Sequence, residues 1–281
     1  MTKKFRWSNV YLVVIFALLY APIFYLIFYS FNEGGSMTTF TGFTWDNYQA
    51  VIEDSRLIII VLNTFMLAFL SALIATIIGT FGAMGIYYMK KRRSRNLLLS
   101  FNNILLVSPD VIIGASFLIF FTFIGSIVGG FRLGFFSVLL SHIAFSIPIV
   151  VLMVLPKLKE MNDSMVDAAR DLGASNLQVI QRIILPFLTP GVIAGYFMAF
   201  TYSLDDFAVT FFVTGNGFST LAVEIYSRAR QGISLEINAL SALVFLFSMI
   251  LVIGYYFISQ DNTSKKARKK RQEAQEVAQL R

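Results

Sequence analysis

Residues 157–186 read KLKEMNDSMVDAARDLGASNLQVIQRIILP, a stretch of 30 residues with long apolar runs on both sides. The stretch is too polar to cross a membrane and too varied to be a low-complexity linker. Asn162 or Asp163 can cap a helix start, because a short side-chain oxygen accepts from the free N–H groups of the first turn. Gly173 suits the left-handed position that ends such a helix, and Ser175 can cap a second one. The pattern therefore predicts a folded helical hairpin.

Each predicted helix of this hairpin carries an apolar stripe at helical spacing. The stripe of the first helix consists of Met165, Ala168, Ala169 and Leu172, and that of the second of Leu177, Ile180 and Ile184. Pro186 follows at the mouth of the next apolar run, where we expect a break or kink. An amphipathic hairpin resting on the membrane surface is one interpretation. The small pair Ala168 and Ala169 before a glycine turn favours another, docking to a second protein.

The composition of the chain indicates a membrane protein. Of 281 residues, 57% are apolar and 14% are charged, and the mean hydropathy is +0.71, whereas about 25% of residues are charged in soluble domains. The chain has no cysteine and a single histidine, His142, which excludes disulfides, thiolate metal sites and histidine clusters. The net charge of +7 does not indicate nucleic-acid binding, because the cations lie in short runs between apolar stretches.

We predict an all-α integral membrane protein with six transmembrane helices, since a spanning helix needs about 20 mostly apolar residues. The spans run over Val10–Phe31, Leu57–Tyr88, Leu97–Ile124, Leu133–Leu155, Ile183–Leu204 and Ile237–Ser259. The expected organisation is an anchor helix with an external loop (1–56), a transmembrane domain (57–260) and a basic tail (261–281). The first span lacks a small-residue cleavage site, so we expect a retained anchor rather than a signal peptide.

The distribution of Lys and Arg predicts the orientation. With the amino terminus inside, 19 of the 23 basic residues lie on the cytoplasmic side. The four on the other side are Arg56, Arg132, Arg228 and Arg230. Since positive charge is kept inside, we expect both termini to be cytoplasmic. The tail is expected to lie on anionic membrane lipid.

Several segments resemble a known family. Asp167-Ala168-Ala169, Gly173, Ile183 and Leu185-Pro186 are similar in spacing to the EAA loop of the membrane-spanning subunits of ABC importers, with Asp167 in place of the usual Glu. Further segments resemble the spermidine/putrescine branch with its PotC-type permeases. These segments are Ser108–Asp110, Ser203–Asp206, Phe212–Gly215 and Glu236–Ala239.

The resemblance implies a type I ABC importer permease in the cytoplasmic membrane of a bacterium, working by alternating access. Its loop residues Asp167, Ala168, Ala169, Gly173, Ile183, Leu185 and Pro186 would form a coupling helix. This helix would sit in a cleft of a cytoplasmic ABC ATPase dimer. A second homologous permease of PotB type and an extracytoplasmic polyamine-binding protein would complete the importer.

The sequence also indicates where the energy for transport comes from and which alternative functions stay open. No G-x-x-x-x-G-K-[ST] phosphate loop occurs, so we expect ATP and Mg²⁺ on a partner ATPase, no cofactor on this chain and no enzymatic reaction here. Alternatives are an ABC permease for thiamine, iron, sulfate or molybdate, and a gradient-driven carrier. An intramembrane enzyme is disfavoured, because no paired catalytic constellation is present.

Acidic residues at membrane depth mark the candidate substrate pathway. Asp110, Asp205 and Asp206 lie in or at the ends of predicted spans, where charged side chains are costly and usually functional. No Lys or Arg lies in the apolar core of these spans, so a cationic substrate such as a polyamine, or a partner subunit, would neutralise them. Asp110 is otherwise a structural acid. Asp205 and Asp206 are otherwise an interfacial helix end, and they point about 100° apart.

Four other residues are weaker candidates. Trp45 and Tyr48 contact substrate or a binding protein, or else belong to the aromatic belt at the membrane interface. Glu224 is either an entry carboxylate or a surface residue. We expect His142 to be hydrogen-bonded between helices rather than to relay protons.

Overall fold

The computed structural model describes residues 7–232, 234–250 and 253, and for residues 7–9 and 128 it describes the backbone alone. The chain divides into two compact units, and each is described here by itself. The core unit comprises Arg56–Ser227 and the flanking unit comprises Met1–Ser55 with Arg228–Arg281. Within the described residues all regular elements are helices, apart from an isolated bridge between Asn32 and Phe43. The predicted division at 56/57 and 260/261 stays a prediction, and the tail 261–281 lies outside the described residues.

The flanking unit contains α1 (Trp7–Tyr29), α2 (Asp46–Glu53) and the helix Leu235–Ile250. The loop between α1 and α2 is organised by Asn32, whose Nδ2 donates to the carbonyl oxygens of Ser36 (2.7 Å) and Thr39 (2.8 Å). Because this buried amide satisfies several loop groups at once, it fixes the loop conformation.

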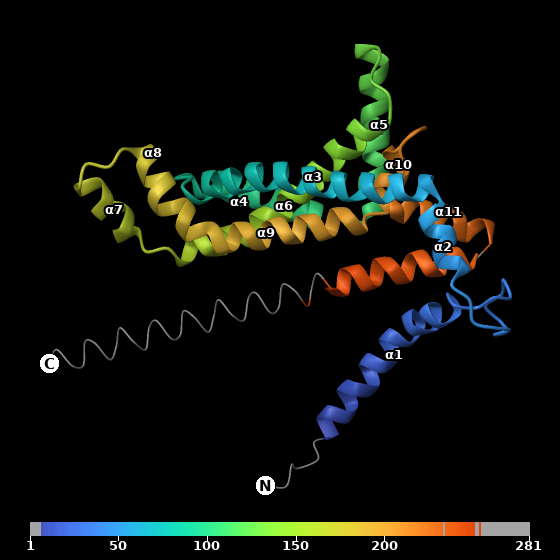
Figure 1. Cartoon of the computed structure of the whole chain (residues 1–281). Coiled ribbons are helices and arrows are strands. Elements are labelled where there is room, and N and C mark those ends of the chain that lie inside the picture. The colour runs from blue at the N-terminus through green and yellow to red at the C-terminus, as the bar shows by residue number, and fades with distance from the viewer. Residues whose placement is uncertain (1–6, 233, 251–252, 254–281) are drawn as a thin grey trace, which may run out of the picture. The chain divides into compact units, whose positions relative to one another are not determined.

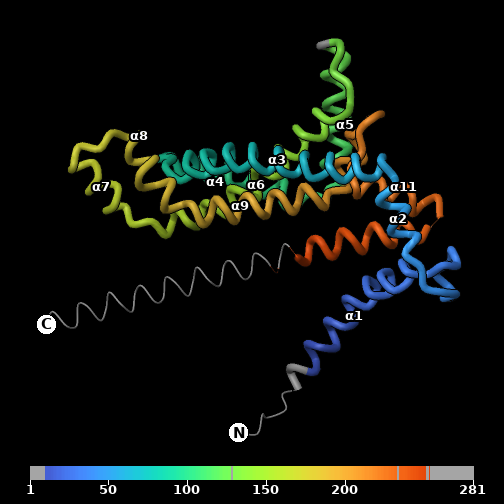
Figure 2. The backbone as a smooth tube through the Cα atoms, viewed as in Figure 1, coloured from blue at the N-terminus to red at the C-terminus, as the bar shows by residue number. Residues whose placement is uncertain are grey.

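The core unit begins in α3 (Ser55–Tyr87) and ends in α11 (Leu221–Gln231), two helices that cross its boundaries (Figure 1). Between them lie α4 (Arg92–Val107), α5 (Asp110–Val128), α6 (Phe135–Glu160), α7 (Asp163–Asp171), α8 (Asn176–Val179), the π-helical segment Ile180–Ile184, α9 (Leu185–Asp205) and α10 (Ala208–Val213). Figure 2 shows α7 and α8 at the end of the unit where α6 ends, with α10 at the opposite end of α9.

Five described helices are long and apolar enough to cross a membrane. They are Val10–Tyr29, Ser55–Tyr87, Asp110–Ile127, Phe135–Glu160 and Asn176–Asp205. The first, second, fourth and fifth predicted spans are therefore confirmed as helices of sufficient length. The sixth agrees with the shorter apolar helix Leu235–Ile250, and most of its predicted remainder lies outside the described residues.

The predicted third span, Leu97–Ile124, is wrong as a single helix. Helix α4 ends at Val107 and α5 begins at Asp110, because Ser108 and Pro109 are extended, with ψ angles of 138° and 131°. Proline lacks an N–H and disfavours helical geometry in the residue before it. The two helices then take different partners: α4 packs on α6, whereas α5 packs mainly on α10. Figure 1 shows α5 turned away from the direction of α4.

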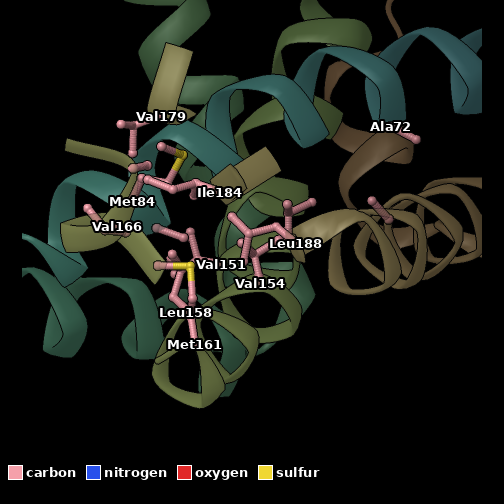
Figure 3. Close-up of a cluster of buried hydrophobic side chains, with 14 residues drawn as sticks. Ala72, Met84, Val151, Val154, Leu158, Met161, Val166, Val179, Ile184 and Leu188 are labelled. Atoms are coloured by element: carbon pink, nitrogen blue, oxygen red, sulfur yellow. The ribbon is translucent and has the colours of Figure 1, made fainter. Parts of the chain in front are cut away.

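A buried apolar cluster joins the hairpin to the bundle. Val154 and Leu158 of α6 pack with Leu188 of α9, and all three are fully buried. Val166 of α7 and Val179 of α8 insert into the same cluster (Figure 3). Since burying each such side chain contributes about 1.5–3 kcal/mol, the hairpin is firmly attached to the helices that lead into the membrane.

Candidate functional site

The hairpin is closed by local hydrogen bonds that follow from its sequence. Asn162 Oδ1 accepts from the Ser164 N–H (3.0 Å) at the start of α7. At the next turn Ser175 Oγ accepts from the Gln178 N–H, and Gln178 Oε1 accepts from the Ser175 N–H (2.8 Å). Gly173 has a φ of +81°, the left-handed conformation that glycine adopts without strain. The predicted caps and glycine turn are confirmed.

The predicted stripe of α7 does not lie on one side of the helix, because Ala169 is buried while its other three residues are exposed. Val166 and Ala169 face the bundle and are buried, whereas Met165, Ala168 and Leu172 are exposed. Leu172 is 89% exposed. The apolar ridge, as we call Met165, Ala168 and Leu172, runs along the outer side of the helix at spacings of three and four residues. The ridge is therefore an apolar surface that the hairpin leaves uncovered.

The second half of the hairpin also has both buried and exposed apolar residues. Val179 and Ile184 are buried, whereas Leu177 is 63% exposed. Ile180 is half-buried, so the predicted second stripe is only partly correct. The predicted break before Pro186 is the π-helical segment Ile180–Ile184, a local widening that often bends a helix.

The motif residues of the hairpin divide between the inside and outside of this structure. Ala169 is buried, and Ile183 and Leu185 pack half-buried against the same cluster. Exposed positions are Asp167, Ala168, Gly173 and Pro186. Pro186 is the second residue of α9 and follows directly after the π-helical segment Ile180–Ile184, where the hydrogen-bond pattern of the helix changes. The motif thus combines an anchor with an accessible surface.

Asp110 is brought to the C-terminal part of α9. It is the first residue of α5 and is exposed. The Tyr202 hydroxyl donates to its Oδ1 over 2.8 Å, and the Tyr202 ring packs edge-on against Phe145. One carboxylate oxygen is thus oriented by a tyrosine. Tyr202 was not predicted as a site residue. Its only signal in the sequence is a phenol group one helical turn before Asp205.

Asp205 and Asp206 differ in their exposure, and Asp206 follows the last residue of α9 in an extended conformation. Asp205 is exposed, whereas the Asp206 side chain is 5% exposed. The Asp206 carboxylate accepts from the N–H groups of Val209 (3.2 Å) and Thr210 (2.8 Å) and from Thr210 Oγ1 (2.7 Å). These bonds hold the first turn of α10. A pathway role for Asp206 stays a prediction, while its contacts are those of a helix cap.

His142 is fully buried in α6 and bonds two other helices. Its Nδ1 lies 2.7 Å from Ser203 Oγ of α9, and its Nε2 lies 2.8 Å from Thr210 Oγ1 of α10. The prediction of an interhelical hydrogen-bonded histidine is confirmed. Among the described residues no group of three or more His, Cys, Asp or Glu side chains is placed to hold a metal ion.

Of the weaker candidates, Glu224 and Tyr48 are buried with side-chain partners, whereas Trp45 is exposed. Glu224 of α11 is buried and its Oε2 lies 3.3 Å from Arg56 Nη2, so the surface alternative is wrong. Tyr48, in the flanking unit, is buried with its hydroxyl 2.7 Å from Ser30 Oγ. Trp45 is 61% exposed. Pathway roles for Glu224, Tyr48 and Trp45 stay predictions.

Comparison with known proteins adds the family context. The family described as binding-protein-dependent transport system inner membrane component matches residues 75–269. The spermidine/putrescine transport system permease protein PotC of Haemophilus influenzae is 33% identical, over 92% of this chain and 99% of its own. PotC of Escherichia coli K12 is 36% identical, over 90% and 94% of the two chains.

Solved structures show the same fold. A chain of a bacterial ABC transporter involved in the import of the acidic polysaccharide alginate has a TM-score of 0.69 at 19% identity, covering 89% of this chain and 92% of its own. A similar match (TM-score 0.68, 18% identity, 89% and 91% covered) is to the alginate transporter in complex with an alginate-bound periplasmic protein.

Proposed function

Because the chain belongs to the binding-protein-dependent transport system inner membrane component family, we propose that it is the permease of an ATP-driven importer that carries spermidine, putrescine or both. The observation that carries this proposal is the identity of 33% to 36% with PotC permeases along nearly the whole chain. The chain is a multi-pass protein of the cytoplasmic membrane and a transport subunit. We place both termini on the cytoplasmic side, in accord with the distribution of Lys and Arg.

The hairpin is the surface we assign to a cytoplasmic ATPase dimer. Its inner side is fixed by Val166 and Val179 in the buried cluster, and its ends are capped. Its outer side presents the apolar ridge, with Leu172 almost fully accessible. A rigid element with an exposed apolar side chain can transmit the closure of a partner protein to the helices that pack against the element. ATP and Mg²⁺ belong to that partner in this proposal.

We assign Asp110 and Asp205 to the substrate pathway, since both carboxylates are exposed near the outer end of α9. A polyamine carries ammonium groups on a flexible methylene chain, so separate carboxylates and aromatic rings such as Tyr202 suit it. Oxyanions such as sulfate or molybdate would instead require cationic groups or N–H donors at this position. A second permease of PotB type and an extracytoplasmic polyamine-binding protein complete the proposed assembly. A solved relative of the same fold has been crystallised with a periplasmic protein.

Deletion of this chain tests the substrate assignment. We expect energised uptake of labelled spermidine or putrescine to be lost in a strain that keeps the ATPase and the binding protein, and to return when the chain is supplied on a plasmid. Thiamine, iron, sulfate and molybdate uptake, measured in parallel, should be unchanged. Undiminished polyamine uptake, or selective loss of one of the other four substrates, would contradict the proposal.

A further inference from the structure

A continuous buried hydrogen-bond chain crosses the core unit from α3 to α10. Ser71 Oγ of α3 lies 2.9 Å from Ser203 Oγ of α9, which in turn lies 2.7 Å from Nδ1 of His142 in α6. The other ring nitrogen of His142 reaches Thr210 Oγ1 of α10. Ser71, His142, Ser203 and Thr210 are all at most 2% exposed. One side chain, His142, therefore joins α9 to α10.

The direction of the bonds around Thr210 follows from counting protons. The Asp206 carboxylate only accepts, so the Thr210 hydroxyl donates its proton to Asp206 Oδ2. Thr210 Oγ1 is then free to accept, and His142 Nε2–H donates to it. This assigns the proton to Nε2 from the network. We call the series of side chains His142, Thr210 and Asp206 the latch. Each donor in the latch has an acceptor, and no buried polar atom of Thr210 is left unpaired.

Helix α10 in turn packs against α5. Val209 and Val213 of α10 share a buried apolar cluster with Ile113 and Phe121 of α5. At Gly114 the two backbones approach so closely that a Cβ would lie 3.1 Å from both the Ala208 carbonyl oxygen and Val209 Cα. Gly114 lies four residues after Asp110, on the same face of α5. The position of α10 therefore determines where Asp110 meets Tyr202.

We propose that His142 is a positioning residue for transport, which holds α10, and through it α5 and Asp110, against the bundle. This inference rests on the proposed function only in its transport readout. Ser137 Oγ also donates to the Val213 carbonyl oxygen (2.7 Å), so α10 has a second attachment at its far end. Loss of the latch should therefore displace the start of α10 without detaching the helix.

Substitutions at Thr210 separate hydrogen bonding from packing. Thr210→Val keeps the shape and removes the hydroxyl, whereas Thr210→Ser keeps the hydroxyl and removes a methyl group. We expect Thr210→Val to lower spermidine uptake about tenfold, because it removes the hydroxyl that bridges His142 Nε2 and Asp206 and leaves only their direct contact of 3.4 Å. Thr210→Ser should stay within about twofold of the parent. Thr76→Val is the matched control, since Thr76 Oγ1 is buried with no hydrogen-bond partner among the described residues.

A substrate-free readout makes the test independent of the proposed function. The chain has no cysteine, so Val209→Cys places a single thiol in the first turn of α10, where Val209 is 1% exposed. In membrane vesicles, N-ethylmaleimide should modify this thiol about tenfold faster in the Thr210→Val background. The rate should not change with Thr210→Ser or Thr76→Val. His142→Ala should reproduce Thr210→Val, and the double variant should be no worse than His142→Ala alone.

The outcomes are distinct. Equal effects of Thr210→Val and Thr210→Ser, additive losses in the double variant, or unchanged thiol protection in Thr210→Val would each overturn the latch. If the thiol pattern holds while the parent chain transports no spermidine, the latch is supported and the proposed substrate is the part that fails.

Discussion

Leu172→Asp is expected to abolish most energised transport while leaving the chain folded and inserted. Leu172 is 89% exposed, so a charge there costs little within this chain. In a complex it would lie in the apolar contact with the ATPase. Truncating or charging such a buried anchor typically costs about 2 kcal/mol or more, roughly a thirtyfold loss. The measurement is ATP-dependent spermidine uptake together with co-purification of the ATPase.

Leu172→Met is the matched control, because it keeps an apolar side chain of similar size on the ridge. It should retain both uptake and co-purification. Val166→Asp provides the opposite case: Val166 is buried in the cluster below α7, so this change should lower the amount of folded chain as well. The interpretation of the ridge would be refuted if Leu172→Asp transported as well as Leu172→Met.

Asp110→Asn is expected to lower polyamine uptake about tenfold or more at unchanged abundance. The substitution keeps the shape and can still accept from the Tyr202 hydroxyl, which lies 2.8 Å from Oδ1. It removes only the negative charge. An ammonium group near an exposed carboxylate gains on the order of 1 to 4 kcal/mol, depending on the local dielectric. Initial rates across a range of spermidine concentrations measure the effect.

Asp46→Asn is a close control for this change. Asp46 is also an exposed aspartate at the first position of a helix, α2, so helix-terminus effects are matched. It should transport like the parent. Unchanged rates in Asp110→Asn at every spermidine concentration would remove Asp110 from the pathway.

The local features of the hairpin were predictable because they depend on neighbouring residues. Asn162 and Ser175 each bond an N–H two or three residues away, and Gly173 adopts the conformation that its lack of Cβ permits. The direction of α7 was not predictable in this way. Val166 and Ala169 are buried because a cluster from α3, α6 and α9 lies beneath them, and nothing in the order of residues along α7 encodes that contact.

The site shows the same limit over longer distances. The length of the apolar run Leu97–Ile124 favoured one span although it contains Pro109, and the two helices separate because they pack on different partners. The hydroxyl of Tyr202 lies 92 positions from Asp110, and Thr210 lies 68 positions from His142. Polar residues in apolar helices marked Asp110 and His142 as special, but their partners required the fold.

The most direct test of the account is the energy dependence of uptake in proteoliposomes. They would contain this chain, a second permease, the ATPase and the binding protein. We predict that labelled spermidine accumulates when ATP is supplied on the ATPase side and does not accumulate with an ion gradient alone. Accumulation driven by an ion gradient without ATP, or an absence of accumulation with ATP and all four components present, would contradict the assignment of this chain as an ATP-coupled polyamine permease.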